Sequence, residues 1–78
     1  MTKESFERDW NVKVEDLHFK QAISDQYGVK IPNTEVAKVG PFEVWKENGS
    51  TYRVSRNHVV CRWRTNLSVY LKEKEVYA

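Results

Sequence analysis

Cysteine is almost absent from the 78 residues, since the chain contains only Cys61. One thiol cannot form an intrachain disulfide, and a structural zinc site requires four ligands, several of which are usually thiolates. We therefore expect a fold that holds together without a disulfide or a metal. A chain of this kind suits a reducing compartment, so we expect it in the cytoplasm.

Glycine is also scarce, and long apolar runs are missing. The three glycines are Gly28, Gly40 and Gly49, and each falls where a turn is predicted. A phosphate-binding loop requires several closely spaced glycines, so we expect no nucleotide cofactor. No apolar run approaches the roughly 20 residues of a membrane-spanning helix, and the first residues are polar. Neither membrane insertion nor secretion is therefore expected.

Charges of both signs are present, but their distribution is uneven. The chain has 13 Lys and Arg against 11 Asp and Glu, a net charge of +2. Residues 1–26 carry 4 basic and 6 acidic side chains, whereas residues 50–78 carry 6 and 2. With 40% hydrophobic and 31% charged residues, the chain 1–78 is typical of one small globular domain, and its last third is basic.

The first residues predict a short helix. Phe6 and Trp10 are four residues apart, so a helix over Lys3 to Trp10 places both side chains on one face. Glutamates in its first turns are favoured there by the helix dipole. Polar and apolar residues then alternate over residues 10–14, which also fits a short strand, and both alternatives stay open.

A second and longer helix is predicted over residues 16–27. Asp16 is a suitable N-cap, and Gly28 stands where a helix would end with a left-handed residue. The apolar residues at helical spacing are Phe19, Ala22, Ile23 and Tyr27. The segment 1–28 is therefore expected to be mainly helical, and residues 33–35 are expected to form a single helical turn or a loop.

Residues 40–72 predict an antiparallel sheet, because apolar residues alternate in one consistent register across three turns. The turns are expected at Glu47–Gly49, Arg56–Asn57 and Thr65–Leu67. The first of them places Val44 opposite Tyr52. The predicted core face consists of Phe42, Val44, Tyr52, Val54, Val59, Cys61, Trp63, Val69 and Leu71. The expected fold class is α+β, with N-terminal helical segments packed on a four-stranded antiparallel meander.

The opposite face of this sheet combines basic and aromatic side chains. Those that we predict to bind nucleic acid or another partner are Trp45, Arg53, Arg62, Arg64, Tyr70 and Lys72. Basic side chains contact phosphates and aromatic rings stack on bases, so this mixture is typical of a sheet that binds nucleic acid. Within the paired region Glu43 is the only expected counter-charge. The alternative is that these charges only solvate an exposed strand face.

Trp45 is the most informative residue of that face, because a large exposed aromatic side chain is unusual. It is either an interface anchor, since Trp and Arg contribute strongly to many binding energies, or it is buried under the N-terminal segment. In the second case Phe6 and Trp10 would cover the outer face and form a second small core there.

We expect a non-catalytic binding domain, with nucleic acid as the first candidate partner. The alternative is a protein-binding adaptor or inhibitor, of the kind that small intracellular or virus-encoded proteins often are. It would use Trp45 and the neighbouring arginines or an edge strand, and it includes homodimerisation. An enzyme is not expected, because no nucleophile, base and orienting group can be assembled. His58 and Cys61 are three residues apart on one predicted strand, so they point to opposite faces.

Overall fold

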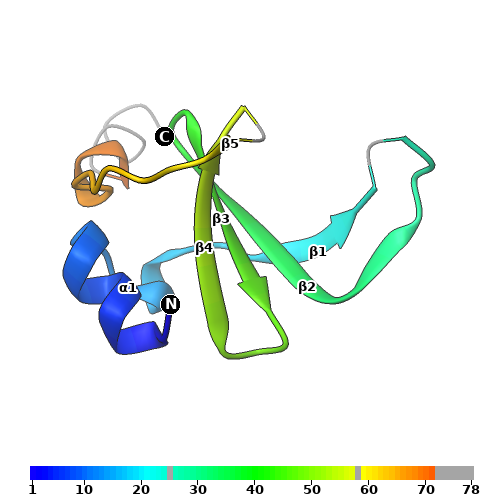
Figure 1. Ribbon diagram of the computed structural model, residues 1–78, viewed down its shortest axis with the longest axis horizontal. Coiled ribbons are helices and arrows are strands. Elements are labelled where there is room, and N and C mark those ends of the chain that lie inside the picture. Colours follow the sequence, from blue (N-terminus) through cyan, green and yellow to red (C-terminus); the bar gives the residue numbers. More distant parts are fainter. Residues whose placement is uncertain (25, 58, 72–78) are drawn as a thin grey trace.

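The computed structural model describes residues 1–24, 26–57 and 59–71, and it confirms an α+β fold. Within these residues, five antiparallel strands follow one another across the sheet in chain order, and a short helix packs beside it (Figure 1). The elements are α1 (Lys3–Trp10), a 3-10 turn (Val14–Asp16), β1 (Lys20–Ile23), β2 (Lys30–Val39), β3 (Phe42–Glu47), β4 (Thr51–Arg56) and β5 (Val59–Val60). The meander thus has five strands in the described part of the chain, where four were predicted.

The helix α1 forms where it was predicted, and its ends have local causes. The hydroxyl of Thr2 accepts a hydrogen bond from the backbone N–H of Ser5 at 3.2 Å and so caps the N-terminus. Asn11 ends the helix in the left-handed conformation, with a φ of 48°. Phe6 and Trp10 are both buried, which confirms that they share the face turned toward the core.

The helix predicted over residues 16–27 is wrong, because this segment contains one strand of a hairpin. The strand β1 pairs with β2, and residues 24 and 26–28 lie in the turn between them. The Ser24 N–H donates to the Val29 carbonyl at 2.7 Å across this turn. Helix propensity is a weak preference, and pairing with a strand of 10 residues overrides it. Gly28 is left-handed as predicted, with a φ of 66°, but it lies in a hairpin turn.

The helical turn or loop expected at residues 33–35 is also wrong, because these residues belong to β2. Asn33 has a φ of 53° inside this strand, an irregularity of the kind that bends a strand. The side-chain amide of Gln21 donates to two carbonyl oxygens of β2 near this point, at 2.7 and 3.1 Å. Beyond it the hairpin projects from the rest of the molecule (Figure 1). We call this projection, residues 21–24 and 26–32, the arm.

The predicted faces of β3 and β4 are confirmed, but their register is wrong by two positions. Val44 lies opposite Val54 rather than Tyr52, because the loop between the strands is Asn48–Ser50. A shift of two residues preserves the alternation of side chains, so the inward residues stay inward. The buried residues of the two strands on this face are Phe42, Val44, Tyr52 and Val54.

The strand β5 is short because the N-terminus occupies the edge along which it would continue. Its two residues pair with the end of β4, and the Cys61 N–H donates to the Val54 carbonyl at 2.9 Å. Continued in this register, the strand would place Trp63 opposite Tyr52. Met1 holds that place, since its carbonyl accepts from the Tyr52 N–H at 2.8 Å and its amine donates to the Tyr52 carbonyl at 3.1 Å. The chain therefore leaves the sheet after Cys61.

Because the chain leaves the sheet after Cys61, the last part of the predicted sheet is wrong. Three residues assigned to the core face are exposed, namely Val59 (68%), Trp63 (87%) and Val69 (46%). Residues 68–71 are helical and form no fourth strand of the predicted meander. Leu67, expected in a turn, is fully buried, because its N–H donates to the carbonyl of Trp10 at 3.0 Å and fixes it at the end of α1.

The core lies between the sheet and segments from both ends of the chain. The ring of Phe6 stacks on that of Tyr52 with centroids 5.3 Å apart, and the ring of Trp10 meets that of Phe42 at 6.4 Å. Leu67 completes this layer, and Cys61 and Leu71 pack against it, partly buried. The sheet is thus covered by α1 and residues 67–71 rather than by a helix over 16–27.

Candidate functional site

Of the six residues predicted to bind a partner, the five that the structure describes do not form one surface. The structure places Trp45 and Arg53 on the outer face of the sheet, Arg62 and Arg64 in the segment after β5, and Tyr70 against the core. The outward position predicted for Tyr70 is wrong, because its ring packs 5.6 Å from that of Phe42, centroid to centroid. Lys72 and His58 lie outside the described residues.

Trp45 is half-buried by its own neighbours on the sheet. Its indole N–H donates to the hydroxyl of Ser55 at 2.7 Å, and the guanidinium of Arg53 lies over its ring, 5.2 Å from the centroid. Arg53 also donates to the carboxylate of Glu47 at 2.9 Å. The helix α1 does not cover Trp45, because it packs on the opposite face of the sheet. The predicted burial of Trp45 under the N-terminal segment is therefore wrong.

Acidic side chains balance the basic charge of the outer face. Lys38 lies opposite Glu43 in the pairing of β2 with β3, and Arg53 forms its ion pair with Glu47. Glu43 was the only counter-charge expected there, but alternation along β3 turns Glu47 outward as well. Basic and acidic side chains therefore alternate on the described part of this face.

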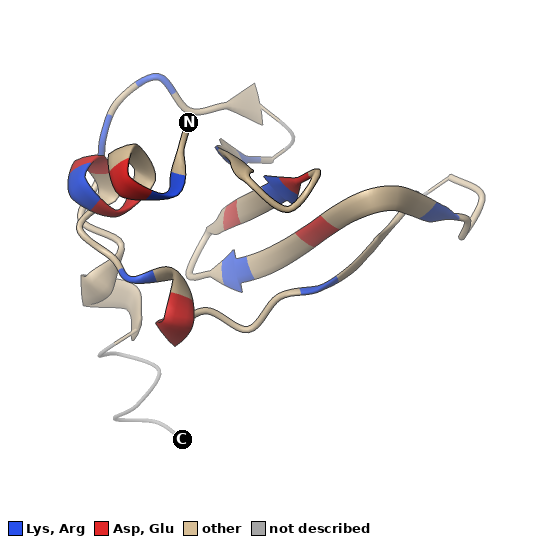
Figure 2. Ribbon diagram, turned by 90° about the horizontal axis from the view of Figure 1, so that it is seen from below, with Lys and Arg blue, Asp and Glu red and all other residues tan. Residues whose placement is uncertain are grey.

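The segment after β5 displays a tryptophan between two arginines. Trp63 is 87% exposed, and Arg62 and Arg64 beside it in the chain are exposed too. Val59 and Val60, just before them, are 68% and 52% exposed. We call these five residues the Trp63 surface. Figure 2 shows basic and no acidic colour between β5 and the helical residues that follow.

The charge of the Trp63 surface is only weakly neutralised at Arg64. Its Nη2 atom lies 3.7 Å from the Oδ2 atom of Asp9, and the arginine side chain is 71% exposed. Asp9 also accepts from Arg8 at 3.3 Å, so it serves two cations. The Asp9 side chain is only 14% exposed, but the 3.7 Å separation is long and the arginine end lies in solvent, and a pair of this kind contributes about 0–1 kcal/mol. Arg64 can therefore exchange Asp9 for another anion at small cost.

Sequence reasoning missed Trp63 because local alternation placed it in the core. The two flanking arginines were then placed on the outer face, which agrees with the alternation of apolar and polar residues along a strand. The contact that turns Trp63 outward joins residues 51 positions apart, Met1 and Tyr52. No local pattern shows such a contact. The available signal was the basic pair around a tryptophan, which a strand register explained equally well.

The arm carries a second group of exposed apolar side chains near its end. They are Ile23 (53% exposed), Tyr27 (75%) and Val29 (61%). The arm stands away from the other described elements (Figure 1), so these side chains lie far from the core. Sequence reasoning had assigned Ile23 and Tyr27 to the buried stripe of a helix, which is wrong.

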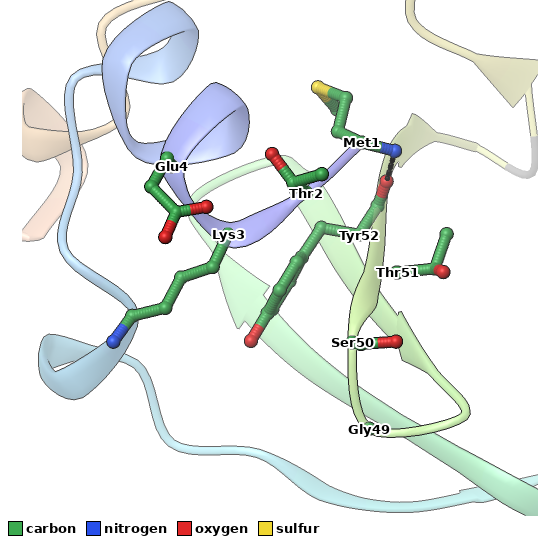
Figure 3. A pocket seen from close by; sticks show the side chains of 8 residues that line it. All are labelled: Met1, Thr2, Lys3, Glu4, Gly49, Ser50, Thr51 and Tyr52. Carbon is green, nitrogen blue, oxygen red and sulfur yellow. Dashed lines mark hydrogen bonds between the residues drawn. The ribbon is translucent and has the colours of Figure 1, made fainter.

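A pocket between the start of α1 and the loop that joins β3 to β4 offers little chemistry. It is lined by residues 1–4 and 49–52 (Figure 3). Its charged side chains, Lys3 and Glu4, have opposite signs, and the amine of Met1 is bonded to the carbonyl of Tyr52. Within residues 1–24, 26–57 and 59–71, no three His, Cys, Asp or Glu side chains are grouped to hold a metal ion.

None of the helices formed by the described residues has the length and apolar character needed to cross a membrane. Comparison with protein-family models, with curated proteins and with solved structures finds no match.

Proposed function

We propose that the protein binds nucleic acid through the Trp63 surface. The observation that carries this proposal is the 87% exposure of Trp63 between two exposed arginines. An indole ring is a large apolar surface that folding normally covers, and nucleic-acid bases stack on such rings. Arginine supplies the phosphate contacts that hold the backbone of a nucleic acid. Ring and charges therefore match the two parts of a nucleotide.

The proposed site differs from the one predicted on the outer face of the sheet. There, Arg53 is held by Glu47 and lies over the ring of Trp45. A base that stacked on Trp45 would have to displace this guanidinium and separate an ion pair. The ring of Trp63 requires no such displacement.

Trp63→Ala is expected to weaken binding of a labelled oligonucleotide about 5- to 150-fold, because stacking on an aromatic ring contributes roughly 1–3 kcal/mol per base. Fluorescence anisotropy measures the affinity. Tyr27→Ala is the matched control, since this aromatic side chain is 75% exposed but lies on the arm, and its affinity should equal that of the parent. Unchanged affinity of the Trp63 variant, or affinity that added salt does not lower, would contradict the proposal.

The arm favours a second candidate function, the binding of a protein partner. Its end exposes Ile23, Tyr27 and Val29, and exposed apolar side chains gathered at one place mark many protein interfaces. Tyrosine is also among the residues that contribute most to interface energies. A hairpin that projects from the body can reach into a groove of another protein or pack on a second copy of this chain.

Ile23→Ser combined with Tyr27→Ser is expected to abolish retention of a protein partner in a pull-down from nuclease-treated lysate. Both side chains are exposed, so the fold should remain intact and circular dichroism should match the parent. Sedimentation of the purified protein shows whether the partner is a second copy. Loss of the partner in Trp63→Ala, but not in the arm variant, would refute a role of the arm.

A further inference from the structure

We propose that the nucleic acid bound at the Trp63 surface is single-stranded. This inference rests on the function proposed above and adds the class of ligand. The ring of Trp63 is 87% exposed, so its face is available for stacking. A base can use that face only when its own face is free, and in a duplex each base is already stacked on its neighbours. Flipping a base out of a duplex costs a few kcal/mol, whereas one stacking contact returns roughly 1–3 kcal/mol.

None of the described elements is suited to bind in the major groove of a duplex. Proteins read the major groove with a helix or with a two-stranded ribbon. The helix α1 has 8 residues, of which two are basic and three are acidic, as its blue and red segments show (Figure 2). The arm is a two-stranded ribbon, but among residues 21–24 and 26–32 it carries a single basic side chain, the exposed Lys30, beside the apolar Ile23 and Val29. Neither element has the basic surface that duplex binding requires.

In the described part of the chain few cations lie near Trp63, which also favours a single strand. Arg62 and Arg64 belong to the Trp63 surface, and Arg8 shares the carboxylate of Asp9 with Arg64. Each phosphate contact on a single strand contributes about −0.7 to the slope of log K against log salt concentration. Two or three contacts therefore give a slope of about −1.4 to −2.1. With so few ionic contacts, stacking on Trp63 has to supply much of the affinity.

The test compares an unstructured thymidine oligonucleotide with a duplex of equal length across a range of salt concentrations. The single strand is expected to bind at least about tenfold more tightly than the duplex, which corresponds to the cost of unstacking a base. Its salt slope is expected to fall between about −1.4 and −2.1. Arg62→Ala and Arg64→Ala should each reduce that slope by the value of one contact.

Variants of Trp63 distinguish stacking on an aromatic ring from the contact that any large apolar side chain would make. Trp63→Phe keeps an aromatic face and should retain the preference for the single strand, whereas Trp63→Leu keeps an apolar side chain without a ring and should lose it. Binding should also quench tryptophan fluorescence. This quenching should persist in Trp45→Phe and disappear in Trp63→Phe, because Trp45 is half-buried and Trp63 is exposed.

The possible results distinguish this inference from the function on which it rests. Equal binding of both ligands, with an affinity that still falls in Trp63→Ala, would overturn the single-strand inference and leave nucleic-acid binding at the Trp63 surface intact. Binding of neither ligand at low salt would overturn both. Retention of a protein through Trp63 without binding of any nucleic acid would replace both with a protein interface at the same residues.

Discussion

Phe6→Ala is expected to remove a large part of the folding free energy of this protein. Phe6 is fully buried and stacks on Tyr52, and truncation of a buried phenylalanine costs about 3–5 kcal/mol. A domain of this size has a total stability of roughly 4–12 kcal/mol. Thermal unfolding followed by circular dichroism should therefore show a fall in Tm of at least about 12 °C, or no cooperative transition.

Phe6→Leu is the control for this experiment, because it keeps an apolar side chain in the same place. It is expected to cost less than about 1.5 kcal/mol. The same comparison tests whether α1 is part of the core, since Phe6 is the residue through which the helix contacts β4 most directly. A loss below about 1 kcal/mol in Phe6→Ala would contradict the packing of α1 on the sheet.

Gly40→Ala is expected to destabilise the protein by about 2–5 kcal/mol. Gly40 has a φ of 57°, and a left-handed alanine costs about 1–2 kcal/mol. An added Cβ atom would also lie 2.7 Å from the Cγ atom of Tyr70, and forced overpacking costs about 1–3 kcal/mol. Chemical denaturation measures the change in the free energy of unfolding. The glycine is therefore required both by the turn and by the ring that rests on it.

Gly49→Ala is the matched control, since it separates backbone strain from the clash. Gly49 has a φ of 75°, but nothing lies within 4 Å of an added Cβ atom, so only the backbone cost of about 1–2 kcal/mol remains. An equal effect of the two substitutions would show that Tyr70 does not pack on Gly40. The double variant Gly40→Ala with Tyr70→Ala should cost less than the sum of its parts, because the clash disappears with the ring.

Local features of the fold were predictable where one physical cause acts alone. The helix over Lys3–Trp10 follows from the spacing of two aromatic residues and from the glutamates in its first turns, and both are visible in the sequence. The faces of β3 and β4 follow from alternation, which survives a register error of two positions. The helix predicted over residues 16–27 was wrong because helical spacing and strand pairing compete there, and the strand that pairs with this segment, β2, is the next element of the chain.

The candidate site was less predictable, because it depends on what the core leaves outside. Trp63 was predicted in the core and is exposed, whereas Tyr70 was predicted on the outer face and packs against the core. The reason is that residues 67–71 pack near α1, while Met1 occupies the edge of β4. Arg62 and Arg64 remain exposed in both descriptions, so the basic part of the site was visible in the sequence. Its aromatic part was assigned to Trp45, which the structure pairs with Arg53.

The shared edge of β4 has a consequence for the behaviour of the protein in concentrated solution. Met1 and Cys61 bond to the outward backbone groups of Tyr52 and Val54, and β5 adds only 2 residues beyond them. A long, flat strand edge recruits strands from other chains and leads to aggregation, whereas a very short edge strand resists this. At this edge of the sheet the protein can therefore display an exposed tryptophan and two exposed valines without offering the long backbone template on which amyloid-like stacking grows.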